Sequence, residues 1–247
     1  MRTPSAARRT SDVLAVAVAL TALASACKSS GEASASAEAK TPPATATATA
    51  APAGGEAIPA GAADSLALRA AADSGRILGA PGAKVWILMA SDFQCPYCKM
   101  WHDQSFAALQ KEYVETGKVR MAFMNFPLDQ HVQAMPAAEA AMCASAQGKF
   151  WPYHTALFQS QSDWEQPGDQ SAKFEGLASK VGADVPRFRS CVQSHVMRAL
   201  IAADRDRMAT HGVQSTPSFF VGTQAMAGAL PTDEFRKAID AALAKAR

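Results

Sequence analysis

Short apolar runs between turn residues predict the strands of a sheet. One run covers residues 85–90 after a Pro-Gly pair, and a second covers residues 118–126 and ends at Pro127. Continuous apolar runs of this length, bounded by turn signals, are typical of buried strands. Farther along, residues 217–222 and 224–228 are separated by a short turn, so we expect them to pair as a β-hairpin.

Apolar residues at helical spacing predict helices in other parts of the chain. The first predicted helix runs from Met100 to about Tyr113, and the last begins near Thr232. Between residues 134 and 208 apolar positions recur every three or four residues, and Gly and Pro divide this stretch into several helices. The order of elements therefore predicts an α/β fold, with a helical subdomain of about residues 131–210 inserted between strands.

Two thiols stand at the predicted corner between the first strand and the first helix, in the sequence Cys95-Pro96-Tyr97-Cys98. Pro96 suits the first position of a helix, which places Cys95 against the unpaired backbone N–H groups of the helix N-terminus. Such groups stabilise a thiolate and lower a cysteine pKa from about 8.5 into roughly the 3.5–7.5 range. We therefore predict that Cys95 is the attacking sulfur and that Cys98, one turn inside the helix, is the buried resolving partner.

Other uses of this cysteine pair are less favourable. A structural zinc site lacks its remaining ligands, because the chain has no second CxxC and no HxxxH motif. A purely structural disulfide would close a tiny loop and stabilise little. A copper-handling thiol protein is a further alternative, since Cu(I) suits two thiols, but the nearby Met89 and Met100 form no recognisable copper motif. Redox chemistry without a cofactor or metal is the favoured interpretation.

The N-terminal pattern predicts export. Arginines precede an apolar run at residues 13–23 that is too short to span a bilayer. The small residues after this run end at Cys27, where they satisfy the rule for signal-peptide cleavage and resemble a bacterial lipobox. We predict a signal peptide of the lipoprotein type over residues 1–26 and lipidation of Cys27. The alternative is an ordinary secreted protein whose cleavage exposes this cysteine.

The next segment has a composition typical of disorder. Residues 27–62 consist almost wholly of Ala, Thr, Ser, Pro, Gly and Glu, so they cannot bury enough apolar surface to offset the entropy of ordering. We predict a disordered tether there and a folded domain over residues 63–247. A hydrophobic content of 49% is enough for a packed core, and a net charge of +2 gives no reason to expect a nucleic-acid partner.

The five cysteines divide in a way that suits an oxidising compartment. With Cys27 lipidated and the CxxC pair active, Cys143 and Cys191 are left for a second pair. A bridge closing so long a loop would stabilise the fold by roughly 4 kcal/mol in the chain-entropy model. The alternative is two separate buried thiols that pack as small apolar residues. The expected compartment favours the bridge.

Three stretches resemble the signature sequences of bacterial DsbA-like thiol:disulfide oxidoreductases. They are residues 91–98 (SDFQCPYC), 147–151 (QGKFW) and 212–222 (GVQSTPSFFVG), in matching order and separation. The resemblance covers essentially all of residues 63–247. It implies a thioredoxin fold with an inserted α-helical subdomain.

The resemblance also implies the position of substrate. It predicts a cis peptide bond between Thr216 and Pro217, in a loop that faces the CxxC motif and leaves backbone groups free to pair with an extended chain. The alternative for Pro217 is an ordinary proline that begins a strand. We expect substrate contacts from these two residues and from Phe93, Pro96 and Tyr97. Trp101 and Trp151, like Phe93, are candidates for lining the same surface, although core packing is the commoner use of each.

One position departs from the family pattern. Members commonly have a buried acid where this chain has Met89, and that acid manages the proton of the resolving thiol. Either Asp92 or a bound water takes over this task, or exchange at Cys98 is slower. A turn or cap is the simpler role for Asp92. His102 can tune the thiolate, but a solvated position on the helix is the expected one; the remaining histidines are expected to be structural.

The combined prediction is an exported, monomeric thiol:disulfide oxidoreductase anchored to a membrane through Cys27. Its expected substrates are cysteine-containing envelope proteins, and a membrane redox partner that the sequence does not identify would restore its redox state. The direction of electron flow stays open. Thr216 supports a reductase or isomerase, because such members of the wider family often have Thr there and the strongest oxidases often have Val.

Overall fold

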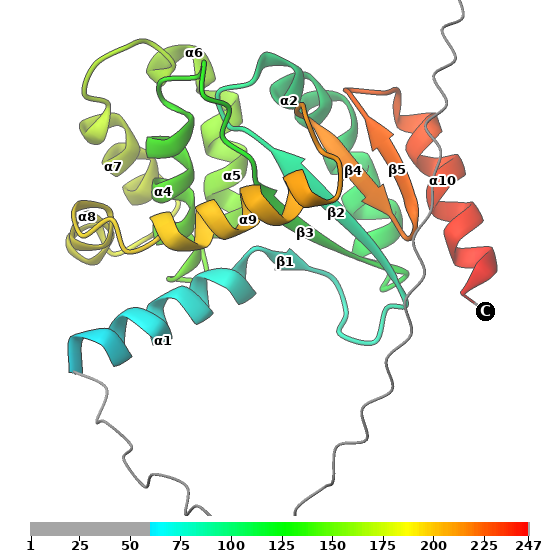
Figure 1. Cartoon of the computed structure of the whole chain (residues 1–247), viewed down its shortest axis with the longest axis horizontal. Coiled ribbons are helices and arrows are strands. Elements are labelled where there is room, and N and C mark those ends of the chain that lie inside the picture. Colours follow the sequence, from blue (N-terminus) through cyan, green and yellow to red (C-terminus); the bar gives the residue numbers. More distant parts are fainter. Residues whose placement is uncertain (1–59, 247) are drawn as a thin grey trace, which may run out of the picture. The chain divides into compact units, whose positions relative to one another are not determined.

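The computed structural model describes residues 60–246 (Figure 1). The predicted signal peptide, Cys27 and the tether up to residue 59 lie outside the described residues. The first described element is helix α1 (Ala60–Gly75), so the last three residues assigned to the tether are helical instead. Within residues 60–246, no helix is both long enough and apolar enough to cross a membrane.

A mixed five-stranded sheet forms the centre of the domain, in the order β1-β3-β2-β4-β5. Strand β2 pairs in parallel with β3 and antiparallel with β4, and β4 pairs with β5 as a hairpin. The two central strands and the hairpin predicted from the sequence are confirmed. The strand bounds are β1 (Ile77–Leu78), β2 (Val85–Ser91), β3 (Val119–Asn125), β4 (Ser218–Val221) and β5 (Gln224–Ala227).

The helix after β2 begins at Pro96, the residue that the sequence suggests for its first position, and continues to Val114. It alternates between α-helical and π-helical turns, and each π turn accommodates one extra residue. Trp101 and Phe106, five positions apart, are consequently both buried. The successive parts are α2 (Pro96–Trp101), η1 (His102–Phe106), α3 (Ala107–Leu109) and η2 (Gln110–Val114).

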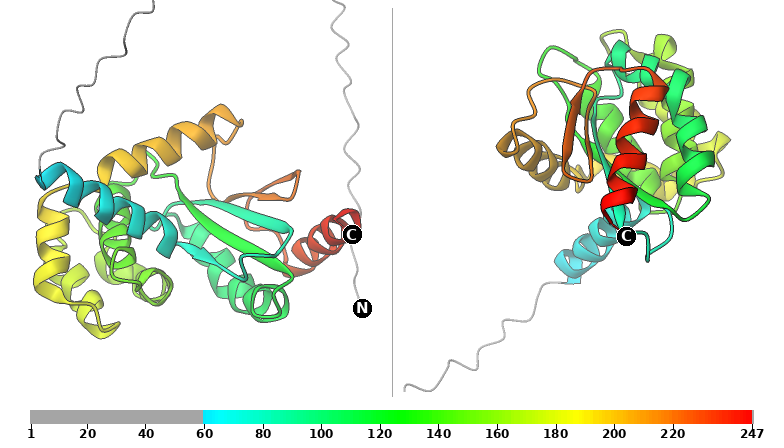
Figure 2. Two further views of the ribbon diagram at one scale, coloured as in Figure 1. Left: turned by 90° about the horizontal axis from the view of Figure 1, so that it is seen from below. Right: turned by 90° about the vertical axis from the view of Figure 1, so that its right-hand side faces the viewer.

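Helices cover both faces of the sheet (Figure 2). On one face lie the helix of residues 96–114 and α10 (Thr232–Lys245), where Trp101 packs against Phe219 of β4 and Phe235 of α10. On the other face lies α9 (Arg198–Thr210), which contacts β3. This arrangement confirms the α/β prediction and the predicted C-terminal helix.

Six helices lie between β3 and β4 in the sequence, from residue 134 to residue 210, where the apolar spacing predicts a helical block. Cys143 of α4 and Cys191 of α8 form a disulfide, so the structure contains the predicted bridge rather than two separate thiols. The six helices are α4 (Ala134–Ser145), α5 (Phe150–Gln159), α6 (Gln161–Trp164), α7 (Ser171–Lys180), α8 (Val185–Gln193) and α9.

Helix α1 packs against α4 and has no counterpart in the sequence-based prediction. Its contact is close, because Ser145 Oγ donates a hydrogen bond to the Ala72 carbonyl at 2.6 Å. A Cβ atom at Gly75 would lie 2.6 Å from the same Ser145 Oγ, so only glycine fits there. The helix is rich in alanine and lacks a regular stripe of large apolar residues, which explains why the spacing did not reveal it.

A buried ion pair fastens the end of α1 to the sheet. The guanidinium of Arg76 donates to Asp204 of α9 at 2.9 Å and to the Phe123 carbonyl of β3 at 2.9 Å. Asp204 also accepts a hydrogen bond from the side-chain amide of Asn125 at 2.8 Å. Arg76 is 3% exposed and Asp204 is fully buried, so this network connects three elements in the interior.

Candidate active site

The CxxC motif lies at the junction of β2 and α2. Cys95 is the N-cap residue of α2 and has an extended backbone, and Pro96 occupies the first helical turn. The Cys95 carbonyl accepts the first helical hydrogen bond, from the Lys99 N–H at 3.1 Å. Because Pro96 lacks an N–H, the N–H groups of Tyr97 and Cys98 are the ones that reach the Cys95 sulfur. The structure thus places Cys95 at a helix N-terminus, as the sequence predicts.

The two thiols differ in charge. Both are reduced and buried. A hydrogen bond from the Cys98 thiol has the largest influence on Cys95; together with Thr216 and the backbone N–H groups of Tyr97 and Cys98 it outweighs burial and lowers the pKa of Cys95 to about 6. Burial, followed by the neighbouring Cys95 sulfur, raises the pKa of Cys98 well above its ordinary value. Near neutral pH, Cys95 is therefore a thiolate and Cys98 a thiol.

The loop before β4 faces this pair. The Thr216–Pro217 peptide bond is cis. The Cys95 sulfur lies 3.5 Å from the Thr216 carbonyl oxygen, although 121 residues separate them in sequence. The structure therefore brings together Cys95, Cys98, Thr216 and Pro217. Pro96 and Tyr97 are exposed beside them, with Tyr97 at 62%.

Asp92 ties the segment before Cys95 to a neighbouring loop. Its buried carboxylate accepts hydrogen bonds from the N–H groups of Gln94 at 2.7 Å and Leu128 at 2.9 Å, and pairs with His131 Nδ1 at 2.7 Å. Burial raises the pKa of Asp92, and these hydrogen bonds oppose the rise. The contacts make Asp92 an anchor of the turn. His131, which the sequence treated as scattered, is part of the same site.

Comparison with known proteins identifies the family. Residues 71–241 match the family model described as thioredoxin. A protein of Bacillus anthracis, probable disulfide bond formation protein D, is 30% identical over 174 residues, which are 68% of this chain and 78% of that protein. The crystal structure of oxidised BdbD from Bacillus subtilis superposes with a TM-score of 0.63 at 24% identity, over 69% of this chain and 94% of that one. The chain belongs to the thioredoxin family. It is a DsbA-like protein thiol:disulfide oxidoreductase.

A further relative has a similar sequence within a longer protein. Na(+)/H(+) antiporter NhaA 3 of Salinispora tropica is 32% identical over 176 residues, which are 71% of this chain and 26% of that protein. The likeness is thus to about a quarter of the antiporter's length.

Two expectations about side chains in this DsbA-like oxidoreductase are wrong. Phe93 does not line the surface, because it is only 1% exposed and its ring stacks on Phe123 at 4.8 Å in the core. His102 is not solvated, because the π-helical turn that begins there directs its ring inward against Phe106. Trp101 is also buried, at 1% exposed, and serves packing.

A buried histidine next to this region carries no hydrogen bonds. His154 of α5 is fully buried, and neither of its ring nitrogens has a partner among the described residues. Its ring contacts those of Phe93, His102 and Phe123. Burial, followed by the charge of His102, lowers the pKa of His154 well below its ordinary value. The DsbA-like oxidoreductase therefore holds a neutral imidazole within an aromatic cluster.

Glutamine side chains at the site were missed entirely by the sequence analysis. Gln94 Oε1 accepts a hydrogen bond from the Gln133 N–H at 2.6 Å, and Gln94 Nε2 donates to the Glu165 carbonyl at 2.9 Å. Both partners lie in the stretch between β3 and β4. Because neutral amides carry no reactive group and form no spacing motif, only the fold reveals that they hold the residue next to Cys95.

Proposed function

We propose that this DsbA-like protein oxidises pairs of cysteine thiols in exported proteins through Cys95 and Cys98. The observation that carries the proposal is the asymmetry of the two thiols. Cys95 has a pKa lowered to about 6, whereas the pKa of Cys98 is raised. A stabilised thiolate lowers the free energy of the reduced enzyme, and this makes the oxidised enzyme a better acceptor of electrons.

The reaction begins with the Cys95–Cys98 disulfide. A substrate thiolate attacks the Cys95 sulfur, a mixed disulfide forms, and Cys98 leaves as a thiolate that takes up a proton. The second substrate thiol, as a thiolate, then attacks the substrate sulfur of the mixed disulfide and releases Cys95 as a thiolate. Two electrons pass from the substrate dithiol to the enzyme. The same steps in reverse reduce or isomerise a substrate disulfide.

Substrate binding is assigned to the surface around Cys95. The Thr216 carbonyl lies 3.5 Å from the attacking sulfur, which supports backbone pairing with an extended substrate chain at the Thr216–Pro217 loop. The exposed Pro96 and Tyr97 supply an apolar contact on the other side. Met100, which is 38% exposed on α2, extends that surface. Phe93 has no part in it, because its ring is in the core.

The cellular setting is proposed from the sequence. The signal-peptide pattern at residues 1–26 supports export, and the lipobox-like residues support lipidation of Cys27. A monomer tethered by residues 27–59 would then meet cysteine-containing envelope proteins and a membrane redox partner that regenerates the disulfide. Mass spectrometry of the mature protein tests the anchor, since lipidation adds the mass of the acyl chains at Cys27.

The alternative direction is disulfide reduction or isomerisation. Thr216 supports it, because the resemblance associates Thr at this position with reductases and isomerases. The fold is common to both directions, so the redox potential decides between them.

One experiment tests the proposed function. The oxidised protein is mixed with a reduced, unfolded substrate protein, and substrate disulfides are counted by alkylation and mass spectrometry. In parallel, the Cys95–Cys98 pair is equilibrated with glutathione to obtain its reduction potential. We expect substrate oxidation and a potential above that of thioredoxin, which is about −270 mV. Turnover only with a scrambled-disulfide substrate would favour the isomerase, and no turnover of either substrate would refute the proposal.

A further inference from the structure

A buried glutamine of the inserted helices holds the backbone of the attacking cysteine. Gln161 is the first residue of α6 and is only 4% exposed. Its side-chain Nε2 donates hydrogen bonds to the Phe93 carbonyl at 2.7 Å and to the Cys95 carbonyl at 3.3 Å. An amide nitrogen carries two hydrogens, so both bonds form at once.

The Cys95 carbonyl is an effective point at which to fix this residue. It already accepts the Lys99 N–H at 3.1 Å, the first hydrogen bond of α2, and a carbonyl oxygen has a second lone pair for Gln161. The helix and Gln161 together set the orientation of the peptide group that follows Cys95. The sulfur is joined through Cβ to the Cα atom that carries this carbonyl, so its direction toward the helix N-terminus and the Thr216 carbonyl depends on that orientation.

The contact also has an electrostatic consequence. The N–H groups of an amide carry partial positive charge, and one of those of Gln161 points at the carbonyl oxygen of Cys95, the residue that carries the thiolate. Positive charge of this kind favours the charged form of a thiol. Because the amide is neutral and buried, its effect is only weakly screened by salt.

Neighbouring contacts agree with this assignment. Gln94, between the two carbonyls that Gln161 binds, is itself bonded to the Gln133 N–H and the Glu165 carbonyl. The segment before α2 is therefore held by three points of the inserted helical stretch. Without them, residues 93–95 would be supported by the turn at Asp92 and by the packing of the Phe93 ring against Phe123.

We propose that Gln161 is a positioning residue for thiol exchange, through which the inserted helices set the reactivity of Cys95. This inference rests on the proposed role of Cys95 as the attacking thiol. It assigns the helical insertion a part in the chemistry of the reaction, in addition to its contribution to packing.

The test replaces Gln161 by Met, which has similar length and no donor. The rate of iodoacetamide alkylation of Cys95 in the reduced protein is measured from pH 4 to pH 9. We expect the midpoint to rise by about 0.5–1 pH unit, so that alkylation at pH 6 becomes about twofold to fivefold slower while the rate at pH 9 is unchanged. At pH 7, the equilibrium with glutathione should shift about threefold to fivefold toward the disulfide.

Gln170→Met is the matched control. Gln170 is also a buried glutamine of the inserted stretch, but its amide donates to the Gln166 carbonyl at 2.9 Å. Losing one neutral hydrogen bond there lowers the free energy of unfolding modestly. We expect Gln170→Met to keep the wild-type midpoint for Cys95. A Gln161→Met variant that loses stability in the same way and also keeps the wild-type midpoint would overturn the proposal.

Two further measurements keep the proposal testable if Gln161→Met does not fold and if the wild-type thiol is not activated. Should Gln161→Met fail to fold, Gln161→Asn keeps the polar head and shortens its reach by one methylene, and an unchanged midpoint in that variant overturns the proposal equally. A wild-type midpoint near 8.5, the value of a free cysteine, would refute the proposed role of Cys95 itself. The failure of the inference is thus separate from the failure of the proposed function.

Discussion

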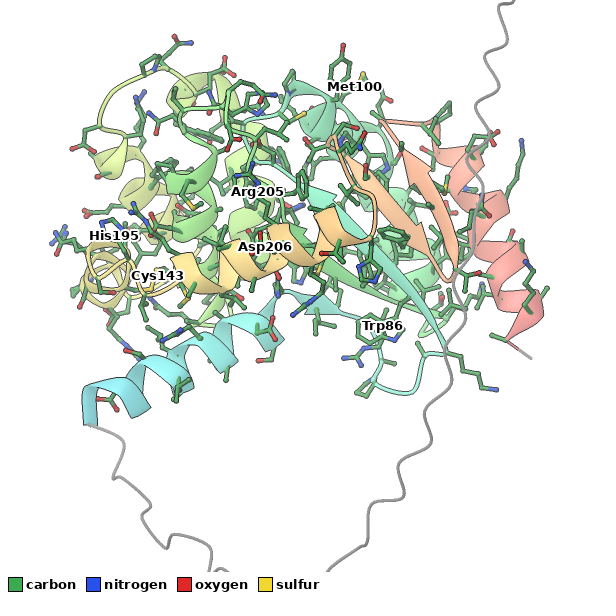
Figure 3. The ribbon with its side chains drawn as sticks, in the orientation of Figure 1. Trp86, Met100, Cys143, His195, Arg205 and Asp206 are labelled. Carbon is green, nitrogen blue, oxygen red and sulfur yellow. A yellow bond between two sulfur atoms is a disulfide. The ribbon has the colours of Figure 1, made fainter. Side chains whose placement is uncertain are left out.

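The two cysteine pairs of this protein have different roles: one has the arrangement of an exchanging thiol pair, and the other is a structural disulfide. Cys95 and Cys98 stand at the start of one helix and are both reduced. Cys143 and Cys191 are 48 positions apart and form a disulfide between two helices of the insertion. In Figure 3, Met100, close to the first pair, and Cys143 of the second lie in separate parts of the domain. The difference between the pairs is one of surroundings.

The ends of the helices explain much of this difference. Cys95 is the N-cap of α2, where unpaired N–H groups stabilise a thiolate. Cys143 lies in the last turn of α4 and Cys191 in the last turn of α8, where unpaired carbonyls disfavour negative charge. Opening the second disulfide would require a leaving thiolate at such a position. Position relative to a helix terminus therefore separates an exchangeable pair from a permanent cross-link.

The most direct test of this comparison removes cysteines of one pair at a time and compares the turnover of the two variants. Cys95→Ala removes the attacking sulfur, so we expect turnover of a reduced substrate to fall about a thousandfold or more, to background. The double variant Cys143→Ala/Cys191→Ala keeps the CxxC pair and should retain activity within about twofold at 25 °C. Both are measured by the rate of substrate disulfide formation. Equal loss in the two variants would mean that the second pair takes part in exchange.

For the free energy of unfolding we expect the opposite ranking, with the larger loss in the double variant of the second pair. We expect Cys143→Ala/Cys191→Ala to lower the free energy of unfolding by about 2–4 kcal/mol, because the unfolded chain regains the freedom of a long closed loop. Cys95→Ala in the reduced protein closes or opens no loop and should change stability much less. Urea unfolding followed by circular dichroism measures both. A double variant as stable as the wild type would contradict the structural role of this bridge.

The aromatic cluster beside the exchanging pair predicts acid sensitivity. The folded-state pKa of His154 lies below its ordinary value of 6.5, so as pH falls below 6.5 the unfolded chain binds a proton that the folded protein does not. The free energy of unfolding therefore decreases as the pH is lowered below 6.5. Between pH 7 and pH 5, we expect the free energy of unfolding of His154→Phe to fall by about 2 kcal/mol less than that of the wild type. Urea unfolding at the two pH values measures this difference. The neighbouring His102 keeps its own, smaller contribution in both proteins.

The smallest predicted effect concerns the pH dependence of the attacking thiol. With a pKa of about 6, Cys95 should be alkylated about tenfold faster at pH 7 than at pH 5. In the unfolded and reduced protein, Cys143 and Cys191 should react with midpoints near 8.5 instead. Peptide mapping after timed iodoacetamide labelling distinguishes the sites. A shared midpoint would show that the fold does not distinguish the two pairs.

The sequence predicts the parts of this molecule that depend on local patterns. Apolar runs predict β2, β3 and the hairpin, and the CxxC motif predicts a cysteine at a helix start. The burial of Phe93 and His102 could not be predicted in this way. Phe93 is followed by the active-site segment, which favours a surface position, and the inward turn of His102 follows from a π turn that breaks regular spacing.

Contacts between distant residues were also beyond the sequence. Asp92 meets His131, and Gln161 meets the carbonyl of Cys95, across 39 and 66 positions respectively. Neither contact follows a fixed interval, because each depends on how the inserted helices pack against the sheet. Polar residues that act through backbone groups leave the weakest trace in a sequence, and at this site they are the ones found only in the structure.

The ion pair of Arg76 and Asp204 has a consequence for how this chain can diverge. Replacing Arg76 leaves the carboxylate of Asp204 buried without its charged partner, which costs about 3–5 kcal/mol. Replacing both by apolar residues of similar volume avoids that penalty. Evolutionary change at the junction of α1 and α9 is therefore expected to proceed by paired substitutions, so that these two positions covary across homologous lineages.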